Sequence, residues 1–471
     1  MKALLGLGLL VLELVSPLRL TALPGSGPEE AEPMSLEKAI QAALQNSREL
    51  RYSLLSQKIA SEKLRLSARR FFPELEVGIS RNDSVLYGDP DSRLRQVSFG
   101  IRQLLFDAGR TVSGLKLQSS ENKLGALDLR ASREELIYSV ILTYIELLCF
   151  KQKKDIDRGV HQTASLQQRI AQEEVRLGVI TELDLLDIAL GLKNIELELE
   201  KAEEEERLLL FKLARLTGSD PAEKKPVPVG TINEEYAGFT AAQSADYWLK
   251  RALENNLELL KLRARLAAQQ EALAAARLRW LPEITGSFSL FFSGVDYPLT
   301  EPGFNLGLQF SFQAPFLPLQ ASASAGKRNP QERSLGYSAS GKLAESLEGL
   351  YSLSLAKLNL QQARGQLEEF EMELKLQIQE SLFTIENQKK ILLLLREKLT
   401  IGQRRMIIQR LRLELGELKR IDFLNEEVNL GKLRVEVLNG QVTLYKQEVA
   451  LLKLCGLPGA LQTGSAIIRG I

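Results

Sequence analysis

The apolar residues of this chain follow two different periods in succession. Between residues 36 and 72 they recur at steps of three and four, which predicts an amphipathic helix. Pro73 ends that pattern, because proline lacks an N–H and disfavours helical geometry in the residue before it. Beyond the proline the apolar residues fall on every second position, as in Leu75, Val77 and Ile79, which predicts a strand with one apolar face.

The same succession of helix, proline and strand occurs again about 209 positions later. The run at 43–50 returns at 252–259, and Pro73 returns as Pro282 without a gap between the two matches. A repeat of this length indicates that one structural unit occurs twice in the chain. The chain therefore consists of two similar halves, and Pro73 and Pro282 are the predicted helix-to-strand breaks.

A long helical hairpin is predicted to follow the strands of each half. The first helix of each hairpin would be roughly 105–110 Å long and the second roughly 50 Å, at 1.5 Å per residue. Two shorter helices stacked end to end would then match one long helix. Tight reversals are predicted near 178–184 and 416–422, where Gly178 with Asp184 is repeated by Gly416 with Asp422.

The chain is predicted to contain two repeats joined by a linker. Its segments are a signal peptide at 1–25, a first repeat at 35–218, a linker at 219–244, a second repeat at 245–458 and a flexible tail at 459–471. The four predicted strands lie at about 74–84, 94–104, 283–293 and 303–313. A segment at 314–340, rich in Pro, Ala, Ser and Gly, is predicted to be irregular and has no counterpart in the first half.

Strands of about 9–11 residues with one apolar face have the length that crosses a bilayer when tilted. A soluble sandwich shows the same alternation, but only four strands flanked by very long helices favour the membrane. Four strands cannot close a barrel alone, and lipid tolerates no open sheet edge. Several copies of the chain are therefore predicted to share one barrel.

The composition and the absence of catalytic motifs limit the kinds of partner and the kinds of chemistry expected of this chain. The chain is 44% hydrophobic and 26% charged with a net charge of +1, so it lacks the basic excess of a nucleic-acid-binding protein. Cys149 and Cys455 lie far apart, and no disulfide framework is expected. His161 is the only histidine, and no Gly-x-Ser-x-Gly, phosphate loop or metal-ligand spacing is present. We predict no catalytic residues, no bound cofactor and no metal, and therefore no enzyme.

Three features, two of which occur in both halves, together resemble the TolC family of outer membrane efflux proteins. They are the helix–proline–strand unit, the Leu-Leu-Phe-Asp-Ala-Gly-Arg stretch at 104–110, and the paired turns at 178–186 and 416–424. The resemblance covers residues 35–458. It implies a mainly α fold with a small membrane β part, assembled as a homotrimer in which a 12-stranded barrel continues into an α-helical barrel.

The resemblance also implies a function and a location. The chain would be a passive exit duct in the bacterial outer membrane, with its helical portion in the periplasm, serving efflux or type I secretion. Its partners would be outer membrane lipid, a periplasmic adaptor protein, and an inner-membrane transporter that is either an ABC or a proton-driven pump. Two alternatives stay open at this stage: a periplasmic adaptor (membrane fusion) protein, and a structural coiled-coil envelope protein without a pore.

Candidate site residues follow from the two turns. The adaptor-docking tips implied by the resemblance comprise Gly178, Thr181, Asp184, Leu185, Gly416, Lys419, Asp422 and Phe423. The glycines are also the helix-ending residues that a tight reversal requires, and the aspartates favour a helix N-terminus without any partner. Arg412 and Glu414 form a possible tip constriction. The residues around them are mainly basic, so no acidic gate is predicted there.

Overall fold

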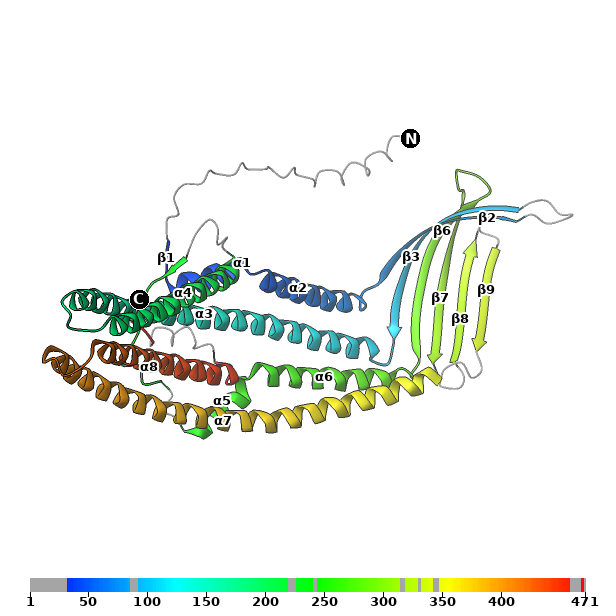
Figure 1. Ribbon diagram of the computed structural model, residues 1–471. Helices are drawn as coiled ribbons and strands as arrows, with labels where there is room; N and C mark the ends of the chain where they lie inside the picture. Colours follow the sequence, from blue (N-terminus) through cyan, green and yellow to red (C-terminus); the bar gives the residue numbers. More distant parts are fainter. Residues whose placement is uncertain are drawn as a thin grey trace.

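The computed structural model describes residues 32–84, 92–218, 226–239, 244–313, 318–328, 332–341, 347–457 and 467–469. The predicted signal peptide at 1–25 lies outside the described residues, as do parts of the predicted linker and tail. The molecule is elongated, with two sets of helices running side by side and a β-sheet at one end (Figure 1).

The first half has the predicted order of elements. Its helices and large strands are α1 (Leu36–Asn46), α2 (Arg48–Arg69), β2 (Glu74–Ser84), β3 (Ser92–Phe106), α3 (Arg110–Arg176) and α4 (Glu182–Thr217). Helix α3 is 67 residues long, which corresponds to roughly 100 Å. Both α2 and α4 pack along α3, so the two shorter helices together match the long one.

The second half repeats this order and adds to it. Its helices and large strands are α5 (Ala245–Asn255), α6 (Leu257–Leu278), β6 (Glu283–Gly294), β7 (Glu301–Gln313), β8 (Pro318–Arg328), β9 (Glu332–Gly341), α7 (Leu347–Glu414) and α8 (Arg420–Leu454). Helices α6 and α8 pack along α7 as α2 and α4 pack along α3, and α3 also contacts α6 and α8 across the halves.

The helix predicted before each proline is in fact two helices. Ser47 ends α1 in an extended conformation, and its hydroxyl accepts the Leu50 N–H to begin α2. Asn256 does the same between α5 and α6, with its side chain accepting the Leu259 N–H at 2.9 Å. Side chains that cap a following helix compete with helix continuation, and this competition explains the break.

The prediction of four large strands was wrong, because the structure has six in one antiparallel sheet. The order is β2-β3-β6-β7-β8-β9, and the last two occupy the segment that was predicted to be irregular. The twelve-stranded barrel that the resemblance implies for a trimer would use only four of these six strands from each chain. Strands β2, β3, β6 and β7 lie close to the predicted positions.

Two small pairings tie the chain ends and the linker to the helices. Strand β1 (Glu32–Met34) pairs in parallel with β4 (Pro226–Pro228), and β10 (Ile468–Arg469) pairs with β5 (Thr231–Ile232). Ile467 and Ile468 are 0% and 4% exposed. The described end of the tail is therefore packed into the molecule, contrary to the prediction that residues 459–471 are flexible throughout.

The main hydrophobic core lies where these small strands meet the two halves. Its largest fully buried side chains include Tyr144 of α3 and Tyr445 of α8. The Tyr144 hydroxyl accepts the Val229 N–H at 3.0 Å and contacts the Val229 and Met34 carbonyls. Glu448 of α8 is 0% exposed, accepts the Phe239 N–H and pairs with Lys389 at 3.5 Å. The Tyr144 hydroxyl and the Glu448 carboxylate are thus satisfied, as burial of polar groups requires.

Candidate functional site

The six-stranded sheet has one continuous apolar face. In an antiparallel sheet directly opposed residues share a face, and Val77 opposes Phe99 while Leu290 opposes Phe304. The members of this face with large exposed side chains are Leu75, Val77, Ile79, Phe99, Ile101, Phe288, Leu290, Phe292, Phe304, Leu306, Leu308, Phe310, Leu319, Leu335 and Tyr337. Their exposed fractions run from 38% to 78% in the single chain. So large an apolar surface requires a nonaqueous environment or a partner.

The opposite face is polar and built of small residues. Gly78 lies opposite Ser98, Gly307 opposite Ser287, and Gly326 opposite Ser334. A Cβ added at any of these three glycines would lie 2.6–2.8 Å from the hydroxyl oxygen of the serine. The strands therefore approach closely on this side, with hydroxyl groups and little side-chain bulk.

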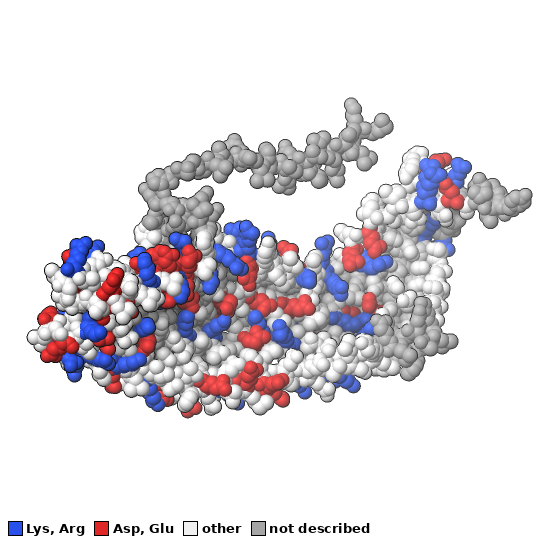
Figure 2. All heavy atoms as spheres, in the orientation of Figure 1, with Lys and Arg blue, Asp and Glu red and all other residues white. Residues whose placement is uncertain are grey.

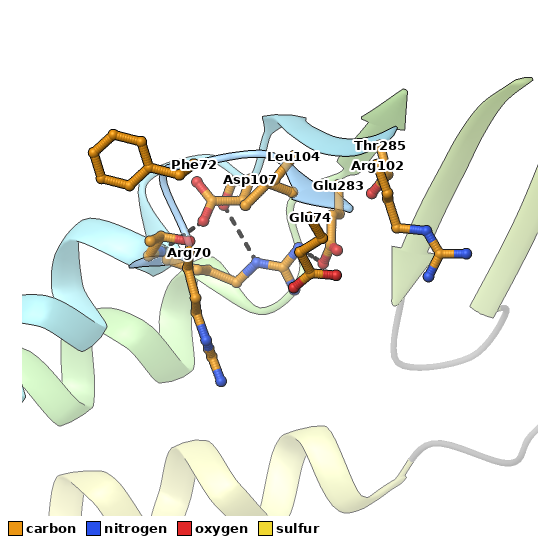
Figure 3. Close-up of a pocket in the computed structure, with 10 residues that line it drawn as sticks. Arg70, Phe72, Glu74, Arg102, Leu104, Asp107, Glu283 and Thr285 are labelled. Atoms are coloured by element: carbon orange, nitrogen blue, oxygen red, sulfur yellow. Dashed lines mark hydrogen bonds and ion pairs between the residues drawn. The ribbon is translucent and has the colours of Figure 1, made fainter. Parts of the chain in front are cut away.

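The junction between sheet and helices carries a cluster of charges on that polar side (Figure 3). Arg110, in the first turn of α3, pairs with Glu283 at the start of β6 at 2.7 Å. Asp107 accepts the Gly109 N–H at 2.9 Å and the Thr111 N–H at 2.6 Å, so it caps α3. The hollow between these groups is also lined by Arg70, Glu74 and Arg102. The Asp-Ala-Gly-Arg stretch thus connects β3 to α3, and its arginine links the first half of the chain to the second.

Charge is distributed differently over the helices. Figure 2 shows acidic and basic side chains intermixed over the helical part. None of the described helices combines the length and hydropathy needed to cross a bilayer. In the same described segments, no cluster of His, Cys, Asp and Glu has a metal-binding arrangement.

The far ends of the helices form two reversals that begin in the same way. Gly178 and Gly416 have φ of +73° and +75°. After α3 the Gly178 N–H donates to the Val175 carbonyl, and the Val179 N–H donates to the Glu174 carbonyl. After α7 the corresponding bonds run from Gly416 and Glu417. This is the Schellman arrangement, in which a left-handed glycine satisfies the last carbonyls of a helix.

The two reversals differ in how the next helix begins. Thr181 and Asp184 form a complete capping box at the start of α4. Hydrogen bonds to Asp184, first from the Thr181 hydroxyl and then from its backbone N–H, hold the pKa of the Asp184 carboxyl below its usual range. At the start of α8 the N-cap is Lys419, which has no capping side chain. Its ammonium lies 3.4 Å from Asp184 of the other reversal.

A stronger contact joins the reversals beside that one. Arg420, the first residue of α8, donates from Nε to Glu174 Oε2 at 2.6 Å and from a terminal nitrogen to Glu174 Oε1. It also donates to Gln167 at 2.9 Å. A bidentate guanidinium–carboxylate pair fixes geometry better than a point charge does. The structure therefore brings the two predicted tips together within one chain, as a single tip surface.

The predicted tip residues differ in exposure. Gly178, Thr181, Gly416, Lys419 and Asp422 are exposed, and Asp184 is half-buried. Leu185 is half-buried and packs inward, and Phe423 is only 3% exposed and packs against Met406 and Leu430.

Sequence reasoning gave no role to the apolar side chains that face solvent at the tips. Leu183 and Leu186 are 68% and 60% exposed. Their position one residue before and two after Asp184 on an amphipathic helix was the available signal. Of the possible constriction, Arg412 lies 3.7 Å from Glu417, and Glu414 is exposed.

The fold of this protein is defined by long helical hairpins that continue into an antiparallel sheet with one apolar and one polar face. Residues 39–219 match the family model described as outer membrane efflux protein. The comparison with curated proteins gives no significant match.

Three solved structures with the same fold are outer membrane proteins by their descriptions, and two of them are described as channels. The Campylobacter jejuni CmeC outer membrane channel is 17% identical, with a TM-score of 0.72 over 89% of this chain and 85% of that one. VceC, an outer membrane protein of Vibrio cholerae, is 15% identical, with a TM-score of 0.73 over 89% of this chain and 96% of that one. The open state of the Neisseria gonorrhoeae MtrE outer membrane channel is 16% identical, with a TM-score of 0.71 over 90% and 89%. The family match confirms, over residues 39–219, the resemblance predicted from the motifs, and the likeness to the solved structures shows that the chain as a whole has the fold of these proteins.

Proposed function

We propose that this protein is the outer-membrane exit duct of a tripartite efflux or type I secretion system. The observation that carries the proposal is the apolar face of the sheet, which continues across all six strands and is exposed in the single chain. Full burial of one large apolar side chain stabilises a protein by roughly 1.5–3 kcal/mol. Lipid contact on this face would remove its side chains from water, while the polar face would line an aqueous lumen.

The sheet requires more than one copy of the chain. β2 and β9 are the first and last strands of the sheet, and each has a neighbour on one side only among the described residues. Unpaired backbone groups are not tolerated in hydrocarbon. By the family resemblance the assembly would be a homotrimer, in which the sheets share one barrel.

A second surface also fits an oligomer. Helix α7 carries Leu394, Ile401 and Ile408 at intervals of seven residues, and Leu415, directly after the end of α7, continues the row. All four are 59–66% exposed. A heptad row of this kind packs against a neighbouring helix in coiled coils. In the trimer it would contact another copy, so that helices of roughly 100 Å enclose a conduit through the periplasm.

The duct would be passive, and its partners would supply energy and opening. The exposed tip surface around Thr181, Asp184, Lys419 and Asp422 would receive a periplasmic adaptor, which joins the duct to an inner-membrane transporter. Arg412 and Glu414, close to the second reversal, would contribute to the narrow end of the conduit. The substrate would cross without covalent change.

The experiment is fractionation of cells that express the full chain, followed by electrophoresis with and without heating. The proposal predicts heat-sensitive oligomers in the outer-membrane fraction. A monomer in the soluble periplasmic fraction would contradict it and favour the adaptor or filament alternative.

A further inference from the structure

The hairpin β8–β9 extends the sheet beyond the four strands that the repeated units supply. β7 pairs with β8 from Gly303 opposite Arg328 to Gln313 opposite Pro318. β8 then pairs with β9 over ten residue pairs without a bulge. The added strands are 11 and 10 residues long, which is the length of a membrane-crossing strand. The hairpin is therefore a full-height part of the sheet.

Both faces of the sheet continue through the hairpin. Ala323 of β8 lies between Leu308 of β7 and Tyr337 of β9 on the apolar side. Ser322 lies between Gln309 and Ser338 on the polar side, and the Ser322 and Ser338 hydroxyls are 2.7 Å apart. Leu335 and Tyr337 are 68% and 77% exposed, so the apolar face extends to the last strand.

The outer edges of β2 and β9 are matched to each other. Every neighbouring pair in the sheet is antiparallel, so the first and last of six strands run in opposite directions. β2 has 11 residues and β9 has 10. We propose that β9 of one copy pairs with β2 of the next, so that the hairpin belongs to the barrel wall. With six strands per chain, the trimer of the proposed function, on which this inference rests, would have eighteen strands.

The two faces and the charges select a register for this junction. Apolar residues of β9 must oppose apolar residues of β2, because a shift of one residue would exchange the faces. The register with Val77 opposite Ala339 also places Ile79 opposite Tyr337 and Asp83 opposite Arg333. If β9 were shifted by two residues so that Arg333 lay opposite Arg81 instead of Asp83, two like charges would face each other, which is unfavourable.

The consequence is a wider exit. Barrel diameter grows roughly linearly with strand number, so eighteen strands give roughly a 1.5-fold larger diameter than twelve. The hairpin widens the wall with little bulk on its polar side, where β8 carries Ser322, Ser324 and Gly326. The outer mouth of this duct would therefore admit broader solutes than a barrel built from the repeated strands alone.

Cysteine cross-linking in the membrane-embedded protein tests the junction. Val77→Cys in β2 is combined in turn with Leu335→Cys, Tyr337→Cys and Ala339→Cys in β9. The expected result is a ladder of covalent dimers and trimers that is strongest with Ala339→Cys. Val77→Cys with Ser338→Cys is the matched control and should not cross-link, because the two positions lie on opposite faces. The native Cys149 and Cys455 are both buried, so the unmodified protein should give no ladder.

A fifth combination separates this inference from the proposed function. If oligomers form in the membrane but Val77→Cys cross-links to Leu308→Cys of β7, the hairpin lies outside the barrel and the inference is overturned. Oligomers in which none of the three β9 positions cross-links would overturn it as well. A chain that forms no membrane oligomer would overturn the proposed function together with the inference.

Discussion

Arg420 and Glu174 form a bidentate ion pair between the first turn of α8 and the last turn of α3. Their side chains are 21% and 22% exposed, so solvent screens the pair only partly. The contact joins two reversals that are more than two hundred residues apart in the sequence, and it sets how close the two tips of one chain lie.

Removal of either partner should loosen the tip. Arg420→Ala or Glu174→Ala should lower hydrogen-exchange protection of the amides that follow Gly178, and the double variant should lose little more than either single one. We expect a coupling energy of about 1–2 kcal/mol, between the values for exposed and buried charged pairs. Arg405→Ala is the control, because Arg405 pairs with Glu426 at 2.7 Å but is 61% exposed. Additive effects at 420 and 174 would contradict the coupling.

The same pair should make the tip sensitive to acid. Hydrogen bonding and charge from Arg420 hold the pKa of the Glu174 carboxyl below its ordinary value of 4.5, against the opposing effect of burial. A carboxyl whose pKa is lowered on folding stabilises the folded form above its unfolded pKa, and this contribution is lost as pH falls through the folded pKa. Tip protection should therefore be constant near neutral pH and decline below about pH 4. Glu174→Gln should reduce that decline and leave the part that comes from Asp184, whose pKa is also lowered. An unchanged decline in this variant would assign all of it to other groups.

Substitution of the glycines that end α3 and α7 should destabilise the tip. Gly178→Ala and Gly416→Ala should each destabilise the tip by about 1 kcal/mol, because both residues have positive φ. No atom lies within 4 Å of the added Cβ, so the cost is conformational rather than steric. Gly365→Ala within α7 is the matched control and should stabilise the helix by about 0.5–1 kcal/mol. Equal effects at the three positions, measured by thermal unfolding of the oligomer, would contradict the cap assignment.

The tip surface should be needed for export and not for assembly. Charge reversal in the double variant Asp184→Lys, Asp422→Lys should abolish export while heat-sensitive oligomers persist. Because Asp184 also caps α4, Asp184→Asn with Asp422→Asn serves as the control that keeps the side-chain shape. Normal export in the reversed variant would remove the docking proposal and leave these residues as helix caps.

The fold was largely predictable from the sequence because local signals agreed in both halves. Pro73 and Pro282 lie between helix and strand, and positions such as Val77 and Leu306 alternate clearly with polar neighbours. β8 was missed because its apolar face is made of Ala321, Ala323 and Ala325, which give almost no contrast with the intervening serines. Alanine also has low strand propensity, so only pairing with β7 and β9 identifies the strand.

The tip was only partly predictable, for a different reason. Gly178 and Gly416 are local features of a helix end, and sequence spacing reveals them. Which charges meet across the two reversals depends on how α3 packs against α8, and no local pattern contains that information. No role of its own was therefore predicted for Arg420, although its side chain pairs with Glu174 across the two reversals.

The most direct test of the membrane assignment compares two neighbouring residues of β7. Leu308 and Gln309 are both exposed in the single chain, on the apolar and the polar face respectively. In the membrane-embedded oligomer, Gln309→Cys should react with a water-soluble maleimide, whereas Leu308→Cys should react only with a lipid-soluble one. Equal reaction of both cysteines with the water-soluble reagent in intact membranes would contradict a lipid-facing sheet.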